Sequence, residues 1–182
     1  MKIYPSLLLF LFALSTAQNS QAGFDINLND HAVRGTFDYL GDPRKKDLVT
    51  DMGLLYAAPE QGNSTIVTHL GLNSGTEDLR LGMRAILANP DGGDVLALGL
   101  GLQGRLWLSP TLSFSGHAYY APQITSLLDS RGYREISVRL NFRINRNDDI
   151  YVGYRSLQVK LDGFADAIEI DEDLMLGIKL NF

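Results

Sequence analysis

The chain has 182 residues, 45% of them hydrophobic, and 16 basic against 21 acidic side chains give it a formal net charge of −5. This balance does not favour nucleic-acid binding, which requires a basic surface. The chain contains no cysteine, which excludes disulfides and cysteine-ligated metals.

The first 22 residues have the layout of a secretory signal peptide. Lys2 supplies the positive charge, residues 3–14 are largely apolar, and Ser20-Gln21-Ala22 is a small-x-small cleavage site. The apolar run is shorter than the roughly 20 residues that a membrane-spanning helix needs. We therefore expect cleavage before Gly23, which leaves residues 23–182 as a single domain.

Ten segments of that domain alternate apolar and polar residues, which is the period of a β-strand. Turn sequences separate them, and Asn89–Gly93 is the clearest. Residues 123–134 and 162–171 are expected to be the longer polar loops. The expected strands cover residues 24–29, 33–39, 48–56, 66–72, 79–87, 96–108, 112–120, 136–144, 150–161 and 174–182.

The ninth of these segments changes parity. Its apolar residues run from Ile150 to Tyr154 on one parity and from Leu157 to Leu161 on the other. If all of them face the same side, the strand needs a bulge near Arg155-Ser156.

The last strand carries one apolar face that ends on the terminal aromatic residue. This pattern resembles the assembly signal of Gram-negative outer-membrane β-barrels. The resemblance implies a cell outer membrane location, reached through the periplasm, and recognition of this strand by the outer-membrane assembly machinery. The residues of the signal are Leu174, Leu176, Ile178, Leu180 and Phe182.

Alternation alone does not tell which face of the sheet points outward, because a soluble barrel such as a lipocalin also alternates. Here the polar parity mixes arginine with glycine, which suits an aqueous lumen better than a soluble surface. Aromatic residues stand near strand ends, where a membrane barrel has its girdles. These are Tyr56, Phe114, Tyr120, Phe142 and Phe182.

These features predict an all-β fold, namely a transmembrane antiparallel up-and-down β-barrel of about ten strands. Eight is the alternative if residues 24–29 do not form a membrane strand. With Phe182 on the periplasmic side, the loops 123–134 and 162–171 face outside. The partners expected from this placement are outer-membrane lipids and lipopolysaccharide.

The mature chain also resembles the YfaZ family of small outer-membrane proteins. The likeness rests on a short first hairpin, Leu-Gly-Leu-Gly-Leu at 98–102, Tyr-Tyr-Ala-Pro at 119–122, Val-Gly-Tyr-Arg at 152–155 and the terminal Phe182. It implies a fold and a location, and it supplies no activity or catalytic residue.

The predicted lumen is rich in basic side chains. On the polar parity only Asp51, with Asp38 as a second candidate, opposes them. The excess favours a narrow anion-favouring pore, since rings of arginine or lysine select anions. The alternative is a salt-bridged plug in a non-conducting structural or surface-interaction barrel. The basic lumen-lining candidates are Arg80, Arg84, Arg105, Arg139, Arg143, Arg155 and Lys179.

A third reading is a lipid-modifying hydrolase that uses His117 with Ser113, Ser115 and Glu135. We do not expect an enzyme, because the parity directs these residues to the lumen and away from lipid. The three histidines lie on different strands without ligand spacing, so we expect no metal and no other cofactor.

Overall fold

The computed structural model describes residues 21–40, 48–58, 63–76, 78–90, 93–164 and 166–182. The predicted signal peptide lies outside these residues except for Gln21 and Ala22, and so does most of the expected turn after the second strand.

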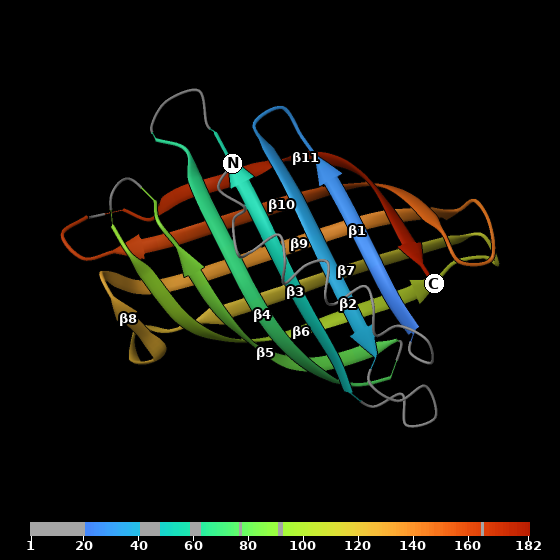
Figure 1. The fold of residues 1–182 in the computed structure, drawn as a ribbon, viewed down its shortest axis with the longest axis horizontal. Coiled ribbons are helices and arrows are strands. Elements are labelled where there is room, and N and C mark those ends of the chain that lie inside the picture. Colours follow the sequence, from blue (N-terminus) through green and yellow to red (C-terminus); the bar gives the residue numbers. More distant parts are fainter. Residues whose placement is uncertain (1–20, 41–47, 59–62, 77, 91–92, 165) are drawn as a thin grey trace, which may run out of the picture.

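The described chain is built almost entirely of β-strands (Figure 1). A single 3-10 turn, η1 Gln123–Thr125, interrupts them. The strands are β1 Gln21–Leu28, β2 Ala32–Leu40, β3 Leu48–Ala57, β4 Thr65–Gly75, β5 Leu79–Ala88, β6 Val95–Trp107, β7 Leu112–Ala121, β8 Ser126–Leu128, β9 Ser130–Arg143, β10 Asp149–Leu161 and β11 Ile168–Asn181.

Ten strands close into one antiparallel ring. From β1 to β7 each strand pairs with the next, β7 pairs with β9, and β9, β10 and β11 follow in order. β1 closes the ring, because its Ile26 lies opposite Gly35 of β2 and Ile178 of β11. β8 only extends the sheet beside β6. The predicted ten-stranded up-and-down barrel is confirmed, and the eight-stranded alternative is wrong.

The two ends of the barrel differ in which connections they hold. Phe182 and the turns after β4, β6 and β9 lie at one end, which we call the C-terminal end. The connections after β1, β7 and β10 lie at the opposite end, together with β8. Figure 1 shows the C-terminus on the right and β8 on the left.

The outer face of the ring is apolar. Along each strand exposed hydrophobic residues alternate with buried or half-buried ones, as in Leu70, Leu72, Leu100 and Leu176. The predicted girdle aromatics are exposed as well, with Phe114, Phe142 and Phe182 toward the C-terminal end and Tyr56 and Tyr120 toward the opposite end. The soluble-barrel alternative, which needs the apolar face inside, is therefore wrong.

Two strands begin six residues earlier than the sequence predicts. β9 starts at Ser130 instead of residue 136, and β11 starts at Ile168 instead of residue 174. Both extensions pair with β10, where Val159 lies opposite Tyr133 and Ile168. Charged residues interrupt the apolar alternation in both extensions, so the sequence pattern does not reveal them. Backbone pairing with β10 forms these parts of the strands whatever the polarity of their side chains.

The bulge predicted near Arg155-Ser156 in β10 is wrong. Arg155, Leu157, Val159 and Leu161 are all buried on one face, so the strand keeps its alternation through residue 155. The register irregularities fall later, between Leu157 and Gln158 against β11 and between Lys160 and Leu161 against β9. Leu157, Val159 and Leu161 face inward because they pack in a hydrophobic core that fills the barrel interior at the end opposite Phe182.

A hydrophobic core fills the interior at the opposite end. Strands β2 to β7 and β9 to β11 contribute to it. The side chains come from the part of each strand that lies nearest this end of the barrel. We call it the apolar plug. Its residues are Ala32, Leu55, Ala57, Val67, Ile86, Ala88, Val95, Ala97, Tyr119, Ala121, Tyr133, Leu157, Val159, Leu161 and Ile170.

The exposed belt predicts unequal tolerance of charge on apolar positions. Leu70 is 55% exposed in mid-strand, whereas Ile124 is 90% exposed in η1 outside the ring. In a bilayer, Leu70→Arg should reduce the free energy of unfolding by about 2–4 kcal/mol. The matched change Ile124→Arg should be nearly neutral. Urea titration of protein refolded into phospholipid vesicles measures both, and equal effects would contradict a lipid-facing belt.

Candidate functional site

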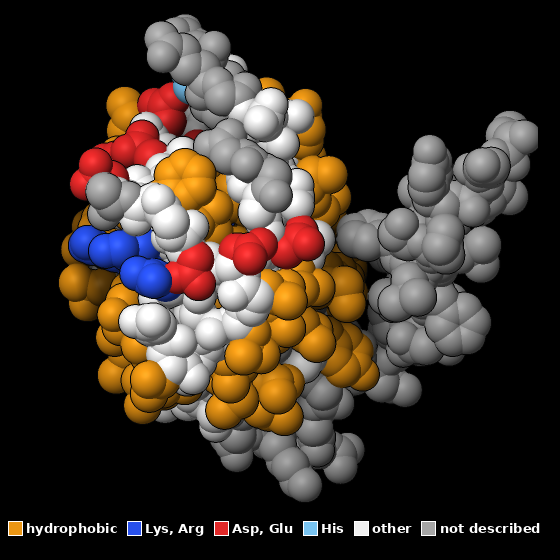
Figure 2. Space-filling view, turned by 90° about the vertical axis from the view of Figure 1, so that its left-hand side faces the viewer, with side chains coloured by type: hydrophobic (Ala, Val, Ile, Leu, Met, Phe, Trp, Pro, Cys, Tyr) orange, Lys and Arg blue, Asp and Glu red, His pale blue; other side chains and the backbone are white. Residues whose placement is uncertain are grey.

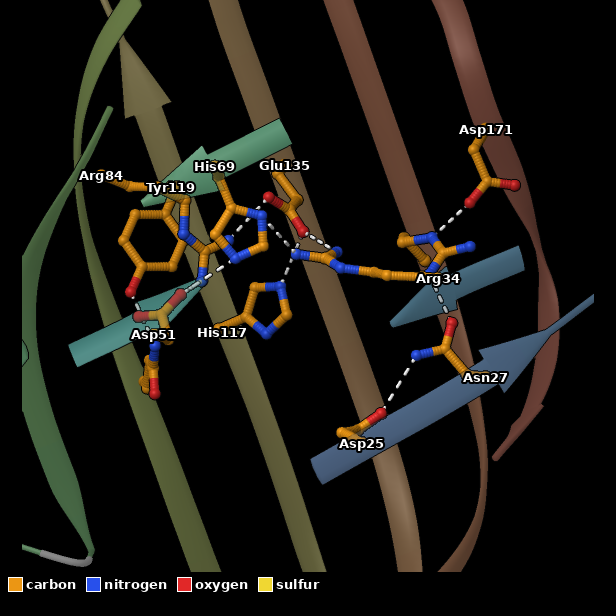
Figure 3. A network of polar contacts seen from close by, with 12 residues as sticks. Asp25, Asn27, Arg34, Asp51, His69, Arg84, His117, Tyr119, Glu135 and Asp171 are labelled. Carbon is orange, nitrogen blue, oxygen red and sulfur yellow. Dashed lines mark hydrogen bonds and ion pairs between the residues drawn. The ribbon is translucent and has the colours of Figure 1, made fainter. Parts of the chain in front are cut away.

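The centre of the barrel holds a buried ion-pair network below the apolar plug (Figure 3). Glu135 of β9, fully buried, is its acceptor. Arg34 of β2 and Arg84 of β5 both donate to this carboxylate, the latter at 2.9 Å. Tyr133 donates from its hydroxyl at 2.6 Å, and His117 Nε2 lies 3.0 Å away. One carboxylate thus ties together four ring strands.

Asp51 of β3 forms the second junction of the network. Its Oδ2 lies 3.0 Å from Arg84 Nη2 and 3.0 Å from His69 Nε2, and its Oδ1 accepts from Asn73. Arg34 Nη2 lies 3.4 Å from His69 Nδ1. Because a guanidinium only donates, His69 must accept at Nδ1 and carry its proton on Nε2, facing Asp51.

Two glycines make room for this junction. A Cβ on Gly71 would lie 2.3 Å from Asp51 Oδ1, and a Cβ on Gly53 would lie 2.2 Å from His69 Cε1. Both contacts are too short for any other residue. Glycine among the lumen-facing positions therefore lets large polar side chains of the neighbouring strand lie flat against the wall.

A second buried chain of contacts runs along β1, β10 and β11. Arg155 pairs with Asp171 and donates to Asn27 Oδ1 at 2.6 Å. Asn27 donates to Asp25, which also accepts from Arg139 at 2.5 Å. These contacts tie the polar face of β1 to β9, β10 and β11, and Figure 3 shows Asp25, Asn27 and Asp171 beside the Glu135 network.

The structure places all the predicted lumen residues inside the barrel. Asp51, Arg84 and Arg155 are fully buried in the networks just described, and Arg139 is bound to Asp25. Arg105 and Arg143 both approach Asp149, at 2.8 and 3.7 Å, and Lys179 pairs with Asp38. Arg80 makes no ion pair with any residue in the described part of the chain.

The expected charge excess is wrong in size. The interior pairs involve six acidic side chains, not two, and Arg34 joins the seven predicted cations. Strand parity could have found the additional residues, because Asp25 and Asn27 alternate with apolar residues in β1 and Glu135 precedes Ile136. The six acids are Asp25, Asp38, Asp51, Glu135, Asp149 and Asp171.

The hydrolase candidates come together only in part. His117 contacts Glu135, but Ser115 Oγ accepts from Asn141 and Ser113 Oγ lies 3.4 Å from the same amide. Among the described residues no serine hydroxyl is hydrogen-bonded to His117. The Glu135 carboxylate is already shared by two arginines and a tyrosine, so it is poorly placed to orient a catalytic base.

A cavity of about 720 Å³ opens at the C-terminal end below the networks. We call it the C-terminal cavity. Its wall is polar and carries six basic against two acidic side chains. These are Arg80, Arg105, Arg139, Arg143, Arg146 and Lys179, with Asp38 and Asp149.

The predicted assembly-signal strand, residues 174–182, forms the second half of β11 and its end. Leu174, Leu176 and Phe182 are exposed on the outer face, while Ile178 and Leu180 are half-buried. The terminal residue is held in the sheet, since Phe182 N donates to Ala22 O at 2.9 Å and Ala22 N to Phe182 O at 3.0 Å. These bonds seal the strand against β1.

Neither a metal site nor a membrane-crossing helix is found in the described part of the chain. No group of three or more histidine, aspartate or glutamate side chains there is placed to hold an ion. No helix there has the length and apolarity to cross a bilayer.

A closed antiparallel ring with an apolar outer face and an ion-paired interior defines a β-barrel of the membrane type. The family described as YfaZ precursor matches residues 6–182. The chain belongs to this family, and the resemblance expected from its sequence is confirmed.

Comparisons with individual proteins add less. No curated protein sequence matches the chain. The NanC porin in a rhombohedral crystal form is similar at a TM-score of 0.40 and 8% identity, covering 90% of this chain and 98% of that one. A structure from work on in-meso crystallization of membrane proteins has a TM-score of 0.35 and 10% identity, covering 90% and 83%. The fold assignment stands on the strand pairing of this chain itself.

The network predicts a large cost for removing its central charge. Glu135→Gln leaves Arg34 and Arg84 buried without a compensating anion at this position, and we expect a loss of about 3–5 kcal/mol in the free energy of unfolding. Asp162→Asn breaks the exposed pair with Arg131 and should cost about 0–1 kcal/mol. Denaturant unfolding in detergent micelles compares the two, and similar losses would show that the buried pairing does not stabilise the barrel.

Proposed function

We propose that the protein is an outer-membrane β-barrel that does not conduct, and that serves as a structural or surface-interaction barrel with a cup open at one end. The apolar plug carries this proposal. Side chains from β2 to β7 and β9 to β11 pack across the lumen at the opposite end, and the ion-paired layer lies directly beneath them. Ions crossing the barrel would have to pass through both layers.

Location in the outer membrane is supported by three features that act together. The exposed apolar belt requires a lipid environment, the closed ring leaves no free strand edge, and the chain belongs to a family of precursors. In this proposal the belt contacts lipid, and the assembly machinery recognises β11 through Leu174, Leu176, Ile178, Leu180 and Phe182.

The C-terminal end is proposed to face the periplasm, as the terminal strand of such barrels does. The opposite end then meets the outside and the lipopolysaccharide layer. Acidic side chains gather at this end, as Figure 2 shows, and exposed ones include Asp94, Asp129, Asp162, Glu169 and Glu172.

The competing function is the narrow anion-favouring pore. It depended on a lumen with seven cations and two acids, whereas the interior pairs hold six acids. The remaining basic excess lies in the C-terminal cavity, on one side of the plug.

Conductance separates these two functions. Purified protein, verified as folded by its heat-dependent gel mobility, should give no stepwise currents in planar bilayers. Stepwise currents with a preference for anions would overturn the closed barrel and support the pore. A known porin, inserted under the same conditions, controls for insertion.

Orientation can be tested on cells because the natural chain has no cysteine. Ile124→Cys, at the opposite end, should react with an outer-membrane-impermeant maleimide on intact cells. Asn147→Cys, in the exposed turn after β9, should react only after the outer membrane is permeabilised. The reverse pattern would invert the topology, and equal labelling without permeabilisation would contradict the membrane placement.

A further inference from the structure

The C-terminal cavity contains a group of arginines that the barrel does not need for closure. Arg105 of β6 and Arg143 of β9 both lie over the ring of Trp107, with Cζ at 5.1 and 4.2 Å from its centroid. Each of these contacts is a cation–π interaction, which holds a guanidinium against the wall. Two like charges thus both contact one indole ring.

The acidic groups nearby do not neutralise this pair. Asp149 is shared between both arginines, at 2.8 Å from Arg105 and 3.7 Å from Arg143. The other acidic residue of the wall, Asp38, is taken by Lys179. Arg80 and Arg146 have no ion-pair partner among the described residues, so the wall keeps a positive excess.

Several N–H donors in this wall are also unused. The Nε atoms of Arg80, Arg139 and Arg143 are buried and have no hydrogen-bond partner in the described chain. A buried donor without an acceptor costs about 1–3 kcal/mol. The wall therefore offers positive charge, and these donors find acceptors only if their side chains turn toward a ligand that brings oxygen atoms.

We propose that the C-terminal cavity binds a small phosphate-bearing anion that enters from the open end. A planar guanidinium fork matches two oxygens of a phosphate, and several forks together favour a multivalent oxyanion over a halide. Its volume of about 720 Å³ lies within the range of roughly 300–1,000 Å³ found for small-molecule pockets. Asn141, Gln103 and His117 add further polar groups to the wall for the rest of the ligand.

This site is independent of conduction and of membrane orientation. It needs only the folded barrel, so it can be measured on protein refolded in a non-ionic detergent. The apolar plug lies between this site and the opposite end of the barrel, so a ligand enters and leaves through the C-terminal end.

Trp107 is the only tryptophan of the chain and contacts Arg105 and Arg143 of the cavity wall, so its fluorescence should respond when a ligand binds these arginines. Titration with pyrophosphate should give a saturable change in emission, whereas sodium chloride at matched ionic strength should not. Arg105→Gln combined with Arg143→Gln should weaken binding tenfold or more. A change that follows ionic strength alone would overturn the proposal.

Calorimetric titration serves as the second measurement, because substitutions beside Trp107 also alter its emission. Arg80→Gln does not touch an ion pair of the described chain, and it should weaken pyrophosphate binding at least threefold while heat-dependent gel mobility stays unchanged. Arg131→Gln, an exposed arginine at the opposite end, is the matched control and should bind as the natural chain does. If the folded Arg80→Gln and Arg105→Gln/Arg143→Gln variants bind pyrophosphate with the same affinity as the natural chain, the proposed site is refuted.

Discussion

The constraint on which the rest of this structure depends is the hydrogen bonding of the backbone. A strand that faces lipid has no water to satisfy its N–H and C=O groups, so each strand needs a partner on both sides. Here β1 provides the closure by pairing with β2 and β11, and Phe182 exchanges two hydrogen bonds with Ala22 at the very end. Once the ring is closed at ten strands, the diameter of the lumen is set, and the side chains inside must fill or hydrate it.

The side chains that fill the interior differ in character along the barrel axis. Near the opposite end apolar residues pack as in an ordinary core, while at mid-height charged residues pair across the lumen. Buried charge is costly when a partner is missing, and here Glu135 pairs with both Arg34 and Arg84 while Asp51 pairs with Arg84. Glycines such as Gly53 and Gly71 are part of the same solution, because they leave space for the large side chains that carry the charge.

The interior is filled over only part of its length, and the proposed binding site lies in the part that is left open. The plug and the paired layer occupy one part of the lumen, and the C-terminal cavity occupies the rest. Arginines within the paired layer serve mainly to stabilise the barrel, since carboxylates already occupy them. Arginines at Trp107, and Arg80, line the C-terminal cavity and give its wall a positive excess. The same residue type thus has two roles, and depth in the barrel separates them.

The sequence by itself predicted about ten ring strands and the outward direction of the apolar face, although not where β9 and β11 begin. Each of these is a local property, because alternation has a period of two residues and turn residues lie between the strands. The lumen position of Arg84 and Asp51 was predictable for the same reason. What only the tertiary structure decided was which side chains meet across the lumen. Glu135 lies 51 positions from Arg84 and 101 from Arg34 in the chain, and no local pattern relates them. The inward Leu157 and Val159 were misread because the sequence shows that a residue is apolar, but not whether lipid or a plug covers it.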